Sequence, residues 1–274
     1  MIAPETRRTD RAWSRIAGHL DARRALPHVE AWYRAYARFG LVVVGVHTPE
    51  FAFEQVTGNV AAAAGGLGVT YPIALDDNYA TWRAYNNEYW PAEYLVDQHG
   101  HVRHTVLGEG DYAATEQAIR TLLIAGGARH LPAPTQVADR TPRDSTTPES
   151  YLGYARLANN GGQPVTDDRA TTYRVPSGVP ADSVVFEGGW DVHADDAVAG
   201  SRAVLDLRFT AKDVYVVLAG EGSVVLRYDG SRVRTIRVAG VPNLYTLHSS
   251  RSVDNGLLSL SVPPGVRAYD FTFG

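Results

Sequence analysis

Residues Ala17 to Phe51 read AGHLDARRALPHVEAWYRAYARFGLVVVGVHTPEF, and this stretch decides how the first part of the chain folds. The larger apolar residues recur at steps of three and four: Leu26, Val29, Tyr33, Tyr36 and Phe39. This period predicts an α-helix from about Ala22 to Arg38, with Gly40 as its stop. The run from Leu41 to Val46 is uniformly aliphatic, which is typical of a parallel strand covered on both faces. The stretch therefore predicts a helix followed by a strand of a sheet covered by helices.

The alternation of strands and helices continues after this strand. Thr48 is the predicted N-cap of a helix that starts at Pro49, because proline is favoured at the first helical position. The remaining strands, two of them a hairpin, and the closing helix are predicted at Tyr71–Leu75, Glu93–Asp97, Val102–Leu107 and Thr115–Ile124. This order indicates an α/β domain.

Composition limits the classes of protein to which the chain can belong. Its 274 residues are 45% hydrophobic and 20% charged, which is enough for one large or two ordinary domains. The net charge of −4 and a pI near 6.1 exclude the basic surface expected of a nucleic-acid binder. The N-terminal sequence MIAPETRRTDRAWSRIAG contains no continuous apolar run, so it predicts neither a signal peptide nor a membrane helix. The absence of cysteine excludes disulfides, thiolate metal sites and cysteine nucleophiles.

A change of composition divides the chain. Residues 126–149 are rich in proline, glycine, threonine and charge without a hydrophobic period, and are predicted to be a linker. Residues 1–125 form the predicted α/β domain. Residues 150–274 contain about eight short strands with period-two alternation, separated by Gly, Pro, Asp and Asn turns. These strands predict a β-sandwich of jelly-roll type.

Four motifs in the first domain resemble one known family. They are GVHTPEFAFE (45–54), YPIALDDNYATWRAY (71–85), YWPAEYLVDQHGHVRH (89–104) and GEGDY (108–112). They resemble the soluble, TlpA-like portion of the DipZ family of membrane-anchored thiol-disulfide oxidoreductases. The segment from Tyr151 onward resembles the β-rich, carbohydrate-binding-module-like domain that follows it in that family. The resemblance therefore implies a thioredoxin-like α/β domain followed by an all-β sandwich.

The same resemblance implies a function. Members of the family have a CxxC dithiol at a helix start, a cis-proline that faces it, and a membrane electron-transfer partner. Their location is extracytoplasmic, with a role in redox homeostasis and cytochrome c maturation, whereas this chain's own sequence leaves its location undetermined.

The dithiol does not carry over to this chain. Its two positions fall on His19 and Ala22, and neither an imidazole nor a methyl group can perform thiol-disulfide exchange. The strand that precedes the dithiol in the family is also not expected, because TRRTDRAWSRIAG has no aliphatic run. We therefore expect an N-terminal part that is degenerate or truncated, no catalytic residue and no cofactor, and a chain inactive as a dithiol reductase in this form.

The cis-proline does carry over, at Pro91. The family places such a bond where the backbone pairs with an extended peptide, so Trp90, Pro91, His47 and Thr48 are the candidate binding residues. The alternative interpretation of Pro91 is an ordinary strand-entry proline beside a packed Trp90. A binding module for a peptide or a membrane partner is then the expected function.

Two further site hypotheses compete with simpler interpretations. Trp190 and Tyr228 could form a sugar face in the second domain, with calcium held by Asp191, Asp195 and Asp196, which makes carbohydrate binding the alternative function. Alternating aromatic residues also fill sandwich cores, and that interpretation is favoured.

His19, His28 and His47 could meet at one end of the first sheet, but their spacing matches no metal motif, so no metal site is predicted.

Overall fold

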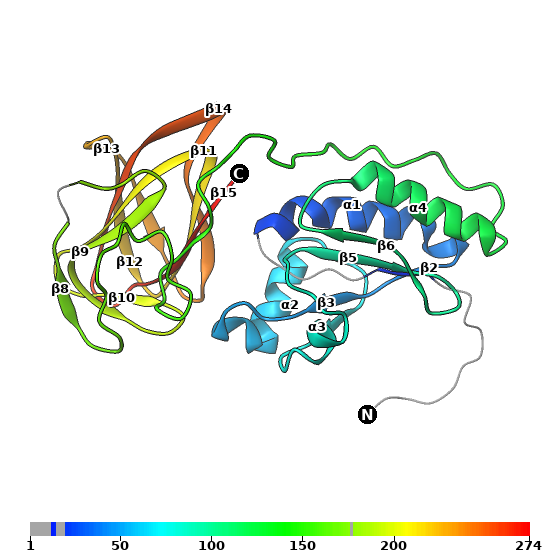
Figure 1. The fold of residues 1–274 in the computed structure, drawn as a ribbon, viewed down its shortest axis with the longest axis horizontal. Helices are drawn as coiled ribbons and strands as arrows, with labels where there is room; N and C mark the ends of the chain where they lie inside the picture. The colour runs from blue at the N-terminus through cyan, green and yellow to red at the C-terminus, as the bar shows by residue number, and fades with distance from the viewer. Residues whose placement is uncertain (1–11, 15–19, 176–177) are drawn as a thin grey trace. The chain divides into compact units, whose positions relative to one another are not determined.

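A computed structural model describes residues 12–14, 20–175 and 178–274, with the backbone alone for residues 12–14 and 20–23. The chain divides into two compact units, Met1–Thr141 and Pro142–Gly274. Each unit has its own buried cluster of apolar side chains. Figure 1 shows helices packed on a sheet in the first unit and strands alone in the second.

The first unit is built on a mixed sheet. Its strands are β1 (Ala12–Ser14), β2 (Leu41–Val43), β3 (Gly45–His47), β4 (Ile73–Leu75), β5 (Ala92–Val96) and β6 (Val102–Leu107). Four of them pair in the order β2-β1-β5-β6, with β1 parallel to β2 and antiparallel to β5. β3 and β4 form a separate parallel pair. The predicted hairpin from Glu93 to Leu107 is confirmed as β5 and β6.

Two strand predictions for this sheet are wrong. The single strand expected at Leu41–Val46 is two strands, because the chain leaves β1 after Val43 and pairs with β4 from Gly45. A strand also precedes α1, although none was expected there. β1 is only three residues long, Ala-Trp-Ser, so its position depends on pairing with β2 and β5 rather than on an aliphatic run.

The helices of the first unit are α1 (Leu20–Tyr36), α2 (Thr57–Gly66), α3 (Ala80–Ala84) and α4 (Tyr112–Ala125), with short 3₁₀ turns at Ala37–Phe39 and Ala52–Gln55. α1 ends at Tyr36, two residues before the predicted end at Arg38, and the 3₁₀ turn Ala37–Phe39 carries the chain to the predicted stop, Gly40, which is in the left-handed region at φ 107°. Its buried face differs slightly from the expected stripe, and consists of Ala25, Val29, Trp32 and Tyr36. These side chains share one cluster with Ile119 and Leu123 of α4 and Leu95 of β5, so both helices cover the same face of the sheet (Figure 1).

The helix predicted from Pro49 is absent from that position. A 3₁₀ turn follows, and α2 begins only at Thr57, so Thr48 is not an N-cap. The Thr48 hydroxyl instead donates to Asp76 across the strand pair, 28 residues away in sequence. A tertiary contact has therefore displaced a local capping preference.

The predicted linker has no helix or strand between Gly126 and Glu149, yet its first part is attached to the first unit. The backbone N–H and hydroxyl of Thr135 both donate to the Glu116 carboxylate at 2.8 Å. Arg120 donates to the carbonyl of Pro132 at 2.6 Å. The first unit consequently extends to Thr141, beyond the boundary expected at residue 125.

The second unit is made of strands. They are β7 (Ser150–Tyr151), β8 (Thr171–Tyr173), β9 (Ser183–Val192), β10 (Ala197–Ala199), β11 (Ala203–Ala219), β12 (Gly222–Tyr228), β13 (Ser231–Val238), β14 (Asn243–Val262) and β15 (Arg267–Phe273). The strand order is β13-β12-β14-β11-β15-β10-β9-β8, with β7 on β15 and a further pairing of β11 with β9. Phe186, Phe209 and Phe271 lie at the centre of its core, each at most 1% exposed.

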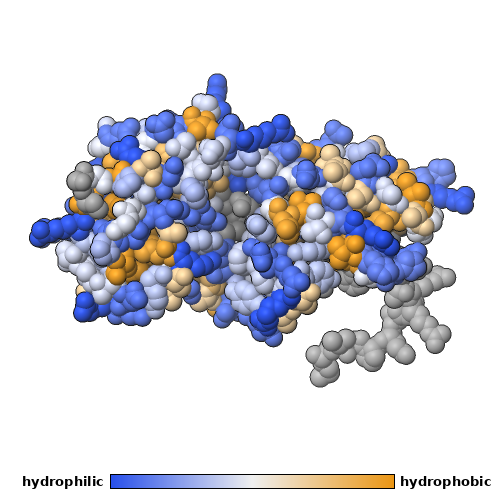
Figure 2. Space-filling model, viewed as in Figure 1, coloured by the Kyte–Doolittle hydropathy of each residue, from blue (hydrophilic) through white to orange (hydrophobic). Residues whose placement is uncertain are grey.

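On the face seen in Figure 2, apolar side chains form small patches separated by polar ones. Among the described residues, no helix is long and apolar enough to cross a membrane.

Candidate binding site around the cis proline

The bond between Trp90 and Pro91 is cis, which confirms the expectation drawn from the family resemblance. Pro91 is buried directly before β5, and its carbonyl accepts a hydrogen bond from Gly108 at 2.8 Å. Trp90 is half-buried. Its indole N–H donates to the carbonyl of Thr48 at 3.3 Å, so the structure brings these three predicted binding residues together.

A second tryptophan completes an aromatic surface beside the proline. The rings of Trp82 and Trp90 lie 4.1 Å apart between centroids. Tyr79 contacts Trp82 edge-on at 6.3 Å and donates its hydroxyl to the carbonyl of Pro49. Rings packed in this way provide a large apolar contact area with little rotamer freedom to lose on binding.

Asp76 is the residue that joins the parts of this site. Its carboxylate is 5% exposed and accepts hydrogen bonds from the Thr48 hydroxyl at 3.2 Å, the Thr81 N–H at 2.8 Å and the Trp82 N–H at 2.9 Å. Burial alone would raise the pKa of Asp76, but the hydrogen bonds from the start of α3 and from Thr48 outweigh burial and lower it. Asp76 therefore fixes the start of α3, and with it Trp82, against the end of β3.

Asp76 was not among the residues expected to form a site. The available signal was its place directly after the predicted strand Tyr71–Leu75, followed by a helix that needs a cap. His47 also lies at this end of β3, but its Nε2 contacts the carbonyl of Glu54 at 3.1 Å. The imidazole is thus held by the loop after β3, and its predicted binding role remains a prediction.

Glu93 was expected only as a strand residue, and the structure places its carboxyl in the core. It follows Pro91 by two positions and shares its face of β5 with Leu95, the face that α1 and α4 cover. The side chain is 4% exposed, and Oε2 has no hydrogen-bond partner among the described residues. Burial raises the pKa of Glu93 to about 8, so the group is mostly protonated at neutral pH.

The architecture and this site can now be set beside known proteins. The thiol-disulfide oxidoreductase YkuV of Bacillus subtilis is 32% identical over 111 residues, which are 40% of this chain and 73% of YkuV. This chain belongs to the thioredoxin-like family of thiol-disulfide oxidoreductases. A family model described as "Thioredoxin like C-terminal domain" matches residues 147–274.

The resemblance to DipZ extends over both units of this thioredoxin-like protein. Protein DipZ of Mycobacterium tuberculosis is 42% identical over 259 residues, which are 93% of this chain. The chain spans 37% of the length of DipZ. Among solved structures, a putative thiol:disulfide interchange protein DsbE from Chlorobium tepidum is 23% identical, with 41% of this chain and 79% of that chain covered at a TM-score of 0.37.

Of the two residues at the family's dithiol positions, the structure describes one. Ala22 lies in the first turn of α1, and His19 lies outside the described residues. His28 is a core residue, 4% exposed and stacked on Tyr112 with centroids 3.7 Å apart, and burial lowers its pKa. No group of three potential metal ligands occurs among the residues with described side chains, which include His28 and His47.

For Trp190 the favoured interpretation, a core residue of the second unit, is confirmed, and its place in a sugar face is excluded. This side chain is 1% exposed, packs against Phe186 at 5.5 Å between centroids, and donates its indole N–H to the carbonyl of Glu187. The alternation of β9 points the ring into the core. Tyr228 is half-buried and donates to Asp254 at 3.0 Å, and its role in binding remains a prediction.

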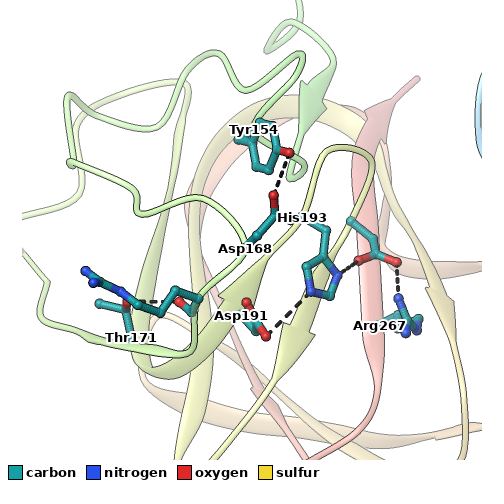
Figure 3. A network of polar contacts seen from close by, with 8 residues as sticks. Tyr154, Asp168, Thr171, Asp191, His193 and Arg267 are labelled. Atoms are coloured by element: carbon teal, nitrogen blue, oxygen red, sulfur yellow. Dashed lines mark hydrogen bonds and ion pairs between the residues drawn. The ribbon is translucent and has the colours of Figure 1, made fainter.

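Two of the three acidic residues considered for calcium, Asp191 and Asp196, instead contact the side chain of His193 (Figure 3). His193 lies between two carboxylates, with Nδ1 2.9 Å from Asp196 and Nε2 3.5 Å from Asp191. Arg267 donates to the other oxygen of Asp196 at 2.6 Å. Both oxygens of Asp196 therefore have side-chain partners, His193 and Arg267, which accounts for this carboxylate without a calcium ion.

Proposed function

We propose that this chain is a thioredoxin-like binding module that holds extended peptide segments at Trp90 and Pro91 and has no dithiol reductase activity of its own. The sequence supports the second part, because none of its 274 residues is cysteine and exchange requires a thiolate. In this proposal a membrane electron-transfer partner, of the kind the family implies, would be bound without receiving electrons from this chain.

The observation that carries the binding role is the set of hydrogen bonds around Asp76. A buried carboxylate fixes Thr48 and Trp82, and Thr48 in turn holds the Trp90 indole. These contacts hold an aromatic surface next to the cis bond, where the family resemblance implies pairing with an extended peptide. Such a preorganised site loses little entropy when a peptide binds.

Carboxymethylated insulin B chain, an extended peptide without free thiols, tests the binding role by isothermal titration. Trp90→Ala should weaken binding at least tenfold, because it removes both the ring and its hydrogen bond to Thr48. Tyr89→Ala is the matched control, since Tyr89 is 51% exposed and adjacent in sequence. Equal losses in both variants, or no binding by the native chain, would show that the site does not hold peptides.

A turnover assay tests the other part of the proposal. The chain should not accelerate the reduction of insulin disulfides by dithiothreitol, and the thiol-disulfide oxidoreductase YkuV provides the comparison. Acceleration above the dithiothreitol background would contradict the proposal. Carbohydrate binding remains the alternative, but without the Trp190 ring, which is buried.

A further inference from the structure

The hairpin of β12 and β13 carries an unusual density of positive charge. β13 is an edge strand, and among the described residues it pairs with β12 alone. It reads SRVRTIRV, with three exposed arginines, Arg232, Arg234 and Arg237, and no acidic residue. Arg227 on β12 adds a fourth, half-buried guanidinium. We call these four side chains the arginine edge.

Carboxylates do not neutralise the arginine edge. Arg227 donates to the Ser261 hydroxyl at 3.0 Å, Arg232 to the Thr235 hydroxyl at 2.8 Å, and Arg234 to a backbone carbonyl. None of the four forms an ion pair within the described part of the chain, unlike Arg267, which pairs with Asp196. The guanidinium groups therefore keep most of their capacity to bind an anion, and their forked geometry suits phosphate oxygens.

The nearest acidic residues in sequence do not cancel this charge. Asp229 lies in the turn of the hairpin, and its carboxylate accepts the N–H of Leu257 at 2.9 Å. Glu221 is exposed just before β12. Four arginines against these two acids leave the hairpin positive, although the whole chain has a net charge of −4. The surface is thus locally opposite in sign to the protein.

Apolar side chains are exposed along the same edge. Val233 is 55% exposed, and the alternation of β13 puts it on the same side of the strand as Arg237 and on the opposite side from Arg232 and Arg234. Val241 follows the end of β13 and is 62% exposed. A soluble polyanion would contact the arginines and leave the valines in water. A lipid surface offers phosphates to the arginines and an apolar layer to the valines at the same time.

We propose that the arginine edge docks on an anionic lipid surface, with its guanidinium groups on headgroup phosphates and Val233 and Val241 in the interfacial layer. Arginines on an edge strand also oppose pairing with other strands, and that role alone predicts no lipid binding. The proposal is independent of peptide binding in the first unit.

Co-sedimentation of the full chain with vesicles tests the proposal. The native chain should bind phosphatidylcholine vesicles that contain one third phosphatidylglycerol, and should stay in solution with phosphatidylcholine alone. Each arginine near such a surface changes the partition coefficient about fivefold, so R232Q/R234Q/R237Q should lower it about a hundredfold. Val233→Ser should lower it several-fold without any change of charge.

Matched variants separate the arginine edge from total charge. R169Q/R174Q/R208Q removes the same charge from three exposed arginines elsewhere in the second unit and should keep vesicle binding. Circular dichroism confirms that each variant is folded. The proposal is overturned if the native chain does not sediment, if both triple variants lose binding equally, if Val233→Ser has no effect, or if the chain binds heparin at the same salt concentration but not vesicles.

Discussion

Replacing Glu93 by glutamine should remove most of the pH dependence of the first unit's stability. The carboxyl is 4% exposed on the face of β5 that α1 and α4 cover, and burial raises its pKa to about 8 from an ordinary value of 4.5. Glutamine has nearly the same shape but carries no charge at any pH. The substitution therefore isolates the cost of burying an ionised carboxylate at this position.

The sign and size follow from the two pKa values. The folded state binds the proton more tightly than the unfolded chain, so the contribution is complete below pH 4.5 and is lost as the pH rises to about 8. At about 1.4 kcal/mol for each pH unit, the loss is about 3 kcal/mol by pH 7 and about 5 kcal/mol by pH 9. Those values are a large fraction of the stability of an ordinary domain.

Urea unfolding between pH 5 and pH 9 measures this effect. Four of the five tryptophans, at positions 13, 32, 82 and 90, belong to the first unit, so tryptophan fluorescence mainly follows its transition. At pH 9 the Glu93→Gln midpoint should exceed the native one by about 2 M or more, whereas at pH 5 the two should nearly coincide. Glu88→Gln is the control, because Glu88 is exposed. Parallel pH profiles for the native and Glu93→Gln chains would refute the reasoning.

Three further substitutions test other parts of the structure. Asp76→Ala removes three hydrogen bonds and should destabilise the first unit by about 2 to 4 kcal/mol, with a red shift of tryptophan fluorescence; unchanged unfolding and emission would contradict its positioning role. Gly153→Ala places a Cβ 2.3 Å from the carbonyl oxygen of Ala194 and should lower the melting temperature of the second unit by several degrees, which calorimetry detects. Glu116→Gln weakens the bonds that hold the predicted linker on α4, so limited proteolysis between residues 126 and 141 should be about tenfold faster.

The sequence was sufficient for features that depend on neighbouring residues. The hairpin from Glu93 to Leu107 and the stop at Gly40 follow from local period and turn chemistry, and both are confirmed, although Gly40 ends a 3₁₀ turn that follows α1. The family resemblance supplied the cis bond before Pro91, and the lack of cysteine is visible in composition alone. Local patterns suffice there because the competing conformations are excluded within a few residues.

The tertiary structure decided features that depend on distant partners. β1 is a strand because it pairs with β2 and β5. Thr48 does not cap a helix as expected, and its hydroxyl donates a hydrogen bond to Asp76 instead. Trp190 fits both a core and a binding face by pattern, and only the packing of β9 places it inside. Likewise, Glu93 looks like any strand residue until α1 and α4 cover it, because burial depends on the whole fold and a short window of sequence contains no measure of it.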